Sequence, residues 1–315
     1  MREDMKIYIA CPAAAVSGGA ELLHQFSQEL TKRNVENYML YYGDTNGSPT
    51  PERYRKYNVK TAARYVDDAD SVFVLPEVGV HEAIRCQKGK AAIWWLSVNN
   101  YIMCYRERFS TTFDIFNIAR KENTFQFVQS QYAKEFLEKY FGIMDSSFLS
   151  DYINDEIIGH AQMNQYTREN ICLYNPAKGL ANVEPLIRNS RDGITWVPLQ
   201  GYSPVEMADL MCRAKLYIDF GGHPGKDRIP REAAVCGCCV ITNREGSARN
   251  AMDIPIPGKY KLEDTGNIPL TLDCIYDTLD HYEDRVGDFA AYRNCILNEK
   301  EQFCLEIDRF LEIMS

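Results

Sequence analysis

The segment GGHPGKDRIPREAAVCGCCVIT, residues 221–242, sets a cluster of charges directly before a run of small and apolar residues. The charged positions are Lys226, Asp227, Arg228, Arg231 and Glu232. Cationic side chains and the open backbone amides of a glycine turn such as Gly225 can offset phosphate charge. Pro230 suits the first turn of a helix, and a carboxylate near that turn can accept the paired hydroxyls of a ribose. The pattern predicts a nucleotide site, with a surface loop of internal ion pairs as the alternative.

Two other glycine-bearing segments follow predicted strands. In LYNPAKGL, Lys178 could extend a compact charge toward a diphosphate, although a solvated surface lysine fits the segment equally well. In CPAAAVSGGAELL, Gly18 and Gly19 precede a helix whose N-terminal amides suit a phosphate or a close-approaching sugar. A tight turn that requires glycine is the alternative there.

A fourth segment, WWLSVNNYIMCYRERF, combines aromatic residues with amides at the end of a predicted strand. Trp95 and Tyr101, next to Asn99 and Asn100 in an expected loop, would make a sugar-facing surface. Core tryptophans followed by a polar turn are the alternative. Glu77, after another strand, is a further candidate acid for the acceptor side.

Strands that alternate with helices must position these residues, which indicates parallel α/β construction. The expected strands are MKIYIACPA, ENYMLYY, SVFVLPE, KAAIWWLSV and TFQFVQS, then NICLYNPAKG, GITWVPLQG, KLYIDFGG and CCVITN. A Ser-Pro-x-Glu signal at Ser203 predicts a helix start. The pattern restarts after a boundary near residues 145–155, and ligands in such sheets lie beyond the carboxyl ends of strands.

The composition supports a two-domain protein, because 315 residues exceed the usual size of a single core. A net charge of -9 argues against nucleic-acid binding, although a locally basic site for an anionic small molecule is compatible with it. Eleven irregularly spaced cysteines fit a reducing compartment. With neither a signal-peptide pattern nor an 18-residue apolar stretch, we expect a cytoplasmic protein. The basic RYRKY segment, residues 53–57, is a candidate for peripheral contact with the inner face of a membrane.

Taken in order, these segments resemble the GT-B glycosyltransferases, specifically the retaining family-4 group. SGGAELLHQFSQEL is similar to that group's glycine loop and first helix, LYNPAKGL to its lysine-glycine element, and PREAAVCGCCVIT to its LEAMA-x-G-x-PVI segment. FVQSQYAKEFLEKYFG and GYSPVEMADLMCRAKLYID match further motifs of the group, so the likeness spans residues 5 to about 245.

The resemblance implies two Rossmann-like domains facing each other across a cleft. Residues 1–150 would be the acceptor-side domain and residues 151–285 the donor-binding domain. A helical segment, residues 286–315, could cross back to the first domain. It implies retaining transfer from a nucleotide-sugar donor to a glycan or lipid-linked acceptor, as in surface polysaccharide synthesis, without a metal or other cofactor.

By motif, Lys178 resembles the diphosphate lysine and Glu232 the ribose-binding second acid of the family's E-x7-E element. Gly18 and Gly19 resemble the loop beneath the phosphates. Pro224 stands where the first acid is expected, so the nearest acid, Asp227, takes the catalytic position. The missing arginine of the lysine element is replaced by Arg228 or Arg231, and the missing histidine of the first domain by Asn99 or Asn100.

These departures keep two alternatives open. One is a catalytically inactive GT-B subunit that supports a partner transferase. The other is a nucleotide-sugar epimerase of the same architecture, which should need an acidic pair and histidines that the sequence does not place in an evident pair.

Overall fold

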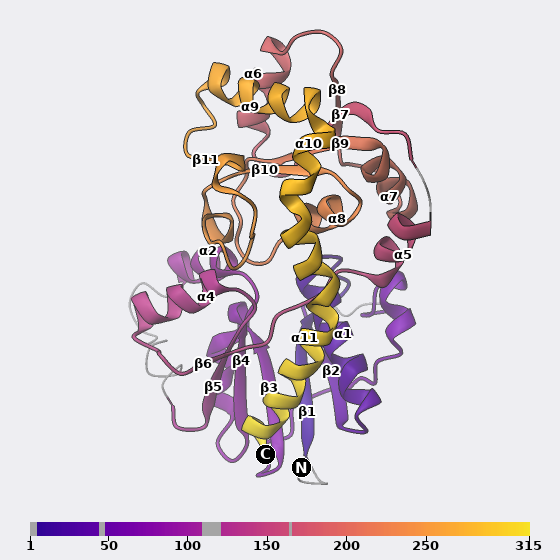
Figure 1. Ribbon diagram of the computed structural model, residues 1–315. Coiled ribbons are helices and arrows are strands. Elements are labelled where there is room, and N and C mark those ends of the chain that lie inside the picture. The colour runs from indigo at the N-terminus through magenta and orange to yellow at the C-terminus, as the bar shows by residue number, and fades with distance from the viewer. Residues whose placement is uncertain (1–4, 44–47, 109–120, 164–165) are drawn as a thin grey trace. The chain divides into compact units, whose positions relative to one another are not determined.

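The structure, a computed structural model, describes residues 5–43, 48–108, 121–163 and 166–315 (Figure 1). The chain divides into two compact units. Unit 1 comprises Met1–Asp151 with Glu301–Ser315, and unit 2 comprises Tyr152–Lys300. Each unit contains one parallel sheet with its own buried apolar core. The long helix α11 (Ala290–Met314) contributes residues to both units.

Unit 1 contains a six-stranded sheet with the order β2-β1-β3-β4-β5-β6. Its strands are β1 (Lys6–Pro12), β2 (Glu36–Tyr42), β3 (Ser71–Pro76), β4 (Lys90–Trp95), β5 (Thr124–Val128) and β6 (Ser146–Phe148). All neighbouring strands run parallel, and β3 is buried along its whole length, as expected of a strand covered on both faces. The strand order changes direction beside β1, so the loops after β1 and β3 lie at the topological switch point where α/β sheets bind ligands.

The helical segments of unit 1 follow the strands along the chain. They are α1 (Gly18–Lys32), η1 (Glu52–Tyr57), η2 (Glu77–Arg85), α2 (Val98–Arg108), α4 (Gln131–Phe136) and η3 (Leu137–Phe141). Helix α1 is amphipathic, and Leu22, Leu23, Phe26 and Leu30 are buried at helical spacing, as the sequence predicts. The start of α2 corrects one expectation, because Asn99, Asn100 and Tyr101 lie in a helical turn and not in a loop.

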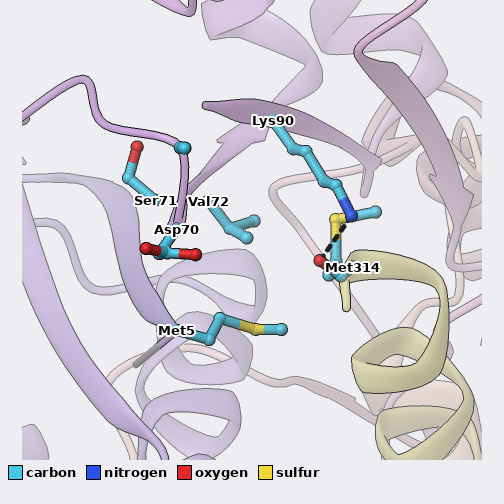
Figure 2. A pocket seen from close by; sticks show the side chains of 7 residues that line it. Met5, Asp70, Ser71, Val72, Lys90 and Met314 are labelled. Atoms are coloured by element: carbon cyan, nitrogen blue, oxygen red, sulfur yellow. Dashed lines mark hydrogen bonds between the residues drawn. The ribbon is translucent and has the colours of Figure 1, made fainter. Parts of the chain in front are cut away.

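The C-terminal half of α11 packs on the unit 1 sheet. The Phe310 ring lies 5.2 Å from that of Phe26 on α1 and 4.8 Å from that of Phe127 on β5, measured between centroids. Figure 2 shows the end of this helix, where Lys90 Nζ donates a 2.7 Å hydrogen bond to the main-chain oxygen of Met314. The small cavity beside this bond, about 10 Å³, has room for about one water molecule, so it belongs to the packing of α11.

Unit 2 contains a five-stranded parallel sheet with the order β11-β10-β9-β7-β8. Its strands are β7 (Glu169–Tyr174), β8 (Thr195–Pro198), β9 (Ala214–Asp219), β10 (Cys239–Asn243) and β11 (Lys261–Leu262). The first strand, β7, lies between β8 and β9, so the strand order changes direction there. The loops after β7 and β9 therefore meet at the switch point of this sheet.

The helical segments of unit 2 alternate with these strands and then continue without further strands. They are α5 (Asp155–Met163), α6 (Leu180–Asn189), α7 (Pro204–Arg213), α8 (Arg228–Val235), η4 (Gly246–Arg249), η5 (Gly258–Tyr260), α9 (Ile268–Asp280), α10 (Tyr282–Arg285) and η6 (Val286–Phe289). Helix α7 begins with the predicted capping box, because the Ser203 hydroxyl accepts from the Glu206 N–H and the Glu206 carboxylate accepts from the Ser203 N–H.

Candidate functional site

The candidate site of unit 2 lies at the carboxyl ends of β7 and β9. The loop after β7 carries Lys178 and leads into α6, and the loop after β9 carries Asp227, the residue that immediately precedes α8. Residues far apart in the sequence meet here because parallel strands end at the same edge of the sheet.

Glycines bring the two loops into close contact. Gly179 has a φ of +70°, and a Cβ atom there would lie 2.4 Å from the main-chain oxygen of Phe220. A Cβ atom on Gly221 would lie 2.5 Å from Cβ of Lys178. Only glycine fits both positions without a backbone shift, and the contact holds Lys178 against the loop after β9.

Polar side chains fix the backbone of the loop after β9. Asn182 Nδ2 donates to the Phe220 oxygen at 2.9 Å, and Asn243 Nδ2 donates to the Gly221 oxygen at 2.9 Å. Further along, the Ser247 hydroxyl donates to the Gly225 oxygen at 2.6 Å. The loop is therefore anchored from the start of α6, from the end of β10 and from η4, which makes a rigid support for the charged groups that it carries.

Lys178, Asp227 and His223 form a continuous charged cluster. Lys178 Nζ lies 2.9 Å from Oδ1 of Asp227, and Nδ1 of His223 lies 3.0 Å from Oδ2 of the same carboxylate. The His223 side chain is fully buried, whereas about a third of the Lys178 side chain is exposed. Lys178 is therefore the member of this cluster that can reach a ligand in solvent.

Asp219 lies on the other side of the His223 ring, at the end of β9. Its Oδ2 accepts a 2.8 Å hydrogen bond from the Tyr217 hydroxyl, and its Oδ1 lies 3.8 Å from Nε2 of His223. Asp219 is 2% exposed, and this burial raises its pKa above the ordinary value of an aspartate. The cluster thus holds one imidazole between two carboxylates.

The remaining pKa shifts follow from these charges. Burial opposes ionisation of Asp227, but the adjacent His223 ring and the Lys178 ammonium group hold its pKa below the ordinary value. Burial also opposes protonation of His223, yet the Asp227 and Asp219 carboxylates raise the pKa of its ring above the ordinary value. The two carboxylates thus favour the charged form of the His223 ring that lies between them.

Two cations predicted to bind the donor are engaged elsewhere. Arg231 is 1% exposed, and its Nη1 lies 2.7 Å from Oε2 of Glu299 on α11. Its Nε and Nη2 donate to the main-chain oxygens of Asp227 and Lys226. Lys226 Nζ lies 2.9 Å from Oε1 of the same Glu299. Arg231 is therefore buried and paired within unit 2, and Lys226 pairs with the same acid, so a contact of either side chain with a donor stays a prediction.

The other residues of this segment lie close to the cluster. Glu232 is 7% exposed in the second turn of α8, and Arg228 begins that helix in a half-buried position. Gly225 is buried in the preceding loop. Their roles in binding a donor remain predictions. His223 and Asp219 were not predicted as site residues. They stand in the pattern D-x3-H-x3-D, residues 219–227, which is the signal that could have indicated them.

In unit 1, the glycine pair lies where the sequence predicts. Gly18 opens α1 directly after the loop from β1, and Ser17 caps the helix by accepting a 3.2 Å hydrogen bond from the Ala20 N–H. Gly18 is exposed and Gly19 half-buried, so the first turn of α1 can be approached by a ligand. A donor contact at these glycines remains a prediction.

The aromatic residues assigned to the acceptor belong to the core. Trp95 has no exposed surface, and its indole N–H donates to the Gln126 side chain at 2.8 Å. The Tyr101 ring lies 4.8 Å from the Trp95 ring, with Phe136 and Phe141 packed on both. Trp95 therefore presents no surface to an acceptor, and Tyr101, 8% exposed, is part of the same cluster, so their acceptor roles stay predictions.

The polar candidates of unit 1 differ in how they are placed. Glu77 is 2% exposed and accepts a 2.9 Å hydrogen bond from the Leu96 N–H, while burial raises its pKa to about 7. Asn100 is exposed and Asn99 half-buried, with Asn99 Oδ1 accepting a long 3.4 Å hydrogen bond from the Tyr132 hydroxyl. Only the two asparagines of this set keep substantial exposed surface.

The candidate membrane-contact segment forms the turn η1. Tyr54 and Tyr57 are buried, and their hydroxyls donate to the Ser17 oxygen and to the Glu21 carboxylate. The apolar side of the segment therefore faces the interior of unit 1. No helix among the described residues is both long and apolar enough to cross a bilayer.

Comparisons with known proteins show the fold. No protein-family model matches the chain, and no curated protein matches its sequence. The structure is similar to a sucrose-phosphate synthase from Thermosynechococcus elongatus, at 14% identity and a TM-score of 0.68, over 98% of this chain and 99% of that one. It is similar to Anabaena HepE in complex with UDP-glucose, at 10% identity and a TM-score of 0.70, with the same coverage of both chains.

A trehalose-phosphate synthase from Burkholderia xenovorans is a third similar structure, at 10% identity and a TM-score of 0.61, again over 98% of this chain and 99% of that one. These likenesses span nearly the whole length of each chain. The chain therefore has the GT-B glycosyltransferase fold, with two Rossmann-like α/β units.

Proposed function

We propose that the protein is a glycosyltransferase that uses a nucleotide-sugar donor, with unit 2 binding the nucleotide diphosphate. The observation that carries this proposal is Lys178, held at the switch point of the unit 2 sheet and partly exposed there. An ammonium group at the carboxyl edge of a parallel sheet, beside the start of α6, suits an anionic ligand. The shared fold with UDP-glucose-bound HepE supports this class of ligand.

In this proposal Lys178 exchanges one anionic partner for another. Without donor it pairs with Asp227, and on binding it turns to the diphosphate, where it stabilises the charge that develops on the leaving group. Asp227, released from Lys178, retains the His223 ring at 3.0 Å. Glu232, in the second turn of α8, would hold the ribose hydroxyls.

The finer parts of the proposal come from the family resemblance. Transfer would retain the anomeric configuration, with the leaving phosphate helping to deprotonate the acceptor. The acceptor would be a glycan or a lipid-linked sugar in surface polysaccharide synthesis, at the cytoplasmic side of a membrane. Asn99 and Asn100 at the start of α2 are the exposed polar candidates for contact with sugar hydroxyls.

The experiment is calorimetric titration of the protein with UDP, GDP, ADP and CDP, followed by the corresponding nucleotide-sugars. We expect one nucleotide to bind, and Lys178→Ala to weaken it roughly 10- to 100-fold, the value of a charge-assisted contact. Lys215→Ala is the matched control, because Lys215 lies at the opposite end of β9 and donates to Asn170 at 2.7 Å. Equal affinity in both variants would contradict the role of Lys178.

An inactive subunit is the second candidate function. It is favoured by Pro224, which stands where the family's first acid is expected, and by the engagement of Asp227 with Lys178. Donor turnover separates the two candidates. A transferase releases nucleoside diphosphate from its donor when acceptor is added, and slowly through hydrolysis without it, whereas the inactive subunit binds the nucleotide and leaves the donor intact.

A further inference from the structure

An open cavity lies at the amino edge of the unit 1 sheet, beside the first residues of β4 and β5. Its volume is about 470 Å³, which is within the range of pockets that bind small molecules. All strands of this sheet run parallel, so the cavity lies at the other edge of the sheet from the loops that follow β1 and β3. Donor and acceptor binding at the carboxyl edges therefore give this cavity no role.

The lining of the cavity is positively charged. Of the described residues that line it, Lys88, Lys90 and Lys121 are cations and Glu122 is the acid, which gives the lining a net charge of +2. The chain as a whole carries a net charge of -9. Like charges repel, so three ammonium groups around one hollow are unfavourable unless an anion joins them. The charge of the lining thus indicates an anionic ligand.

The three lysines present their charge in different ways. Lys121 Nζ donates to the main-chain oxygen of Cys86 at 3.2 Å, a contact that uses one of the three N–H groups of an ammonium and directs the others elsewhere. Lys88 is exposed beside it. Lys90 Nζ donates to the Met314 oxygen at the end of α11, so it contributes charge to the cavity wall from a fixed position (Figure 2).

The loop that carries Lys88, residues 86–89, is firmly held. The Asp67 carboxylate accepts hydrogen bonds from the last three N–H groups of the loop, at 2.9 to 3.2 Å. Asn123 Nδ2 donates to the first and the last main-chain oxygens of the loop, at 3.1 and 2.7 Å. A Cβ atom on Gly89 would lie 2.7 Å from the first main-chain oxygen of β3, so this position requires glycine. Such support at a loop is typical of a binding site that is formed before its ligand arrives.

We propose that this cavity binds a phosphorylated small molecule, with the ammonium groups of Lys88 and Lys121 on its phosphate. A phosphate group offers several acceptor oxygens and up to two negative charges, which suits two ammonium groups better than a carboxylate does. The half-buried ring of Phe125 lines the same cavity and provides an apolar wall for the organic part of the ligand. A hollow of limited volume favours a free molecule over the headgroup of a membrane lipid. The proposal concerns unit 1 alone and does not depend on the proposed function.

The experiment uses pyridoxal 5′-phosphate as the probe on the full chain, because this molecule carries a phosphate and an aldehyde on one ring. The aldehyde condenses with a lysine amine and releases water, and sodium borohydride then supplies the hydride that reduces the imine to a stable secondary amine. Mass spectrometry of peptides measures the labelling of each lysine. We expect Lys88 and Lys121 together to be labelled at least about fivefold more than Lys60, an exposed lysine of unit 1 outside the cavity.

Competition separates the sources of the phosphate. Glucose 6-phosphate in millimolar excess should suppress the labelling of Lys88 and leave that of Lys60 unchanged, whereas glucose should suppress neither. Vesicles of phosphatidylglycerol should give no protection, and protection by the vesicles alone would overturn the proposal in favour of a lipid headgroup. Labelling of Lys178 and its suppression by UDP report on the proposed function, so the two proposals are tested at different lysines.

Lys121→Met tests whether the two lysines act together. The variant keeps the apolar stem and removes the charge, and the Asn123 side chain still holds the Cys86 oxygen. Labelling of Lys88 should fall about fivefold, because the phosphate loses one of its two cations. Lys60→Met is the matched control and should leave the labelling of Lys88 unchanged, and circular dichroism checks that both variants fold. Labelling of Lys88 no stronger than that of Lys60 in the wild-type chain, or unchanged labelling in folded Lys121→Met, would overturn the proposal.

Discussion

The carboxyl edges of the two sheets carry polar residues after their strands but use them in opposite ways. In unit 1, the side chains at the ends of β3 and β4 turn inward. Glu77 accepts from the backbone of Leu96, and Trp95 fills an aromatic cluster. In unit 2, the side chains at the ends of β7 and β9 meet one another as charges, with Lys178 still partly exposed.

This difference shows what decides the fate of a residue at a strand end. An aromatic ring gains more free energy by burial than by a sugar contact whenever a cluster of other rings is within reach. A lysine or an aspartate cannot enter such a core without a partner, so it remains at the edge unless an opposite charge is available inside. Arg231 is the instructive case, because Glu299 provides that partner.

The largest effect on stability is expected from Trp95→Ala. Removing a fully buried indole that contacts several rings should lower the free energy of unfolding by about 3–5 kcal/mol, measured by urea denaturation. Asn100→Ala, an exposed change nearby, is the control and should stay within about 0.5 kcal/mol. A small effect of the tryptophan substitution would show that the unit 1 edge is less closed than its packing indicates.

Arg231→Met should have a comparable or slightly smaller effect in unit 2. The substitution removes the Arg231 Nη1 contact from the buried Glu299 carboxylate and leaves it Lys226 as an ion-pair partner. Loss of one partner of a buried pair costs up to about 3–5 kcal/mol. The double variant Arg231→Met with Glu299→Leu should recover part of that loss, because the buried carboxylate is gone, although Lys226 then loses this acid as a partner. Nucleotide affinity measured near the wild-type value in the stable double variant would confirm the structural role of Arg231.

The effect of Glu77→Gln depends on pH. Burial raises the pKa of Glu77 in the folded state from 4.5 to about 7, so the folded chain holds this proton more tightly than the unfolded chain does. The stabilisation is complete below about pH 4.5 and is lost as the pH rises through about 7. Glutamine does not ionise and can still accept from Leu96, so relative to wild type the variant should gain roughly 3 kcal/mol between pH 4.5 and pH 8.

Denaturation of both proteins across this pH range tests the Glu77 prediction, and the difference between them removes the contribution of other groups. A difference that stays constant with pH would mean that Glu77 ionises normally and that the unit 1 edge admits water.

The alternation of strands and helices was predictable because each strand is a short apolar run between turn residues. Runs such as SVFVLP and CVITN are completely buried, which their composition indicates directly. The two-residue strand β11 and the start of α2 were not predictable. The former has no pattern of its own, and the latter depends on Ser97, whose hydroxyl accepts from the Asn100 N–H to cap the helix.

Within the candidate site, the sequence identified Lys178 and Asp227 through the glycines and prolines around them. It could not pair Lys226 and Arg231 with Glu299, because that acid lies 68 residues after Arg231 on another helix. Nor could it place His223 between Asp219 and Asp227, since the spacing of four residues suggests a helix face, whereas Asp219 ends β9 and the other two residues lie in the loop after it. Which charged side chains can contact a ligand therefore depends on ion-pair partners that are distant in the sequence.

The smallest change in stability is expected at Lys178, the residue with the largest proposed effect on ligand binding. Its ion pair with Asp227 is partly exposed, so Lys178→Ala should alter the free energy of unfolding by less than about 1 kcal/mol. Lys226→Ala should show the reverse pattern, because Lys226 pairs with the buried Glu299 and is not expected to contact the donor. Measuring the free energy of unfolding and the nucleotide affinity of both variants compares the two lysines directly. If Lys226→Ala weakened nucleotide binding more than Lys178→Ala did, the functional edge of unit 2 would have to be reassigned to the loop that precedes α8, because the affinity of an anionic ligand follows the cation that it contacts.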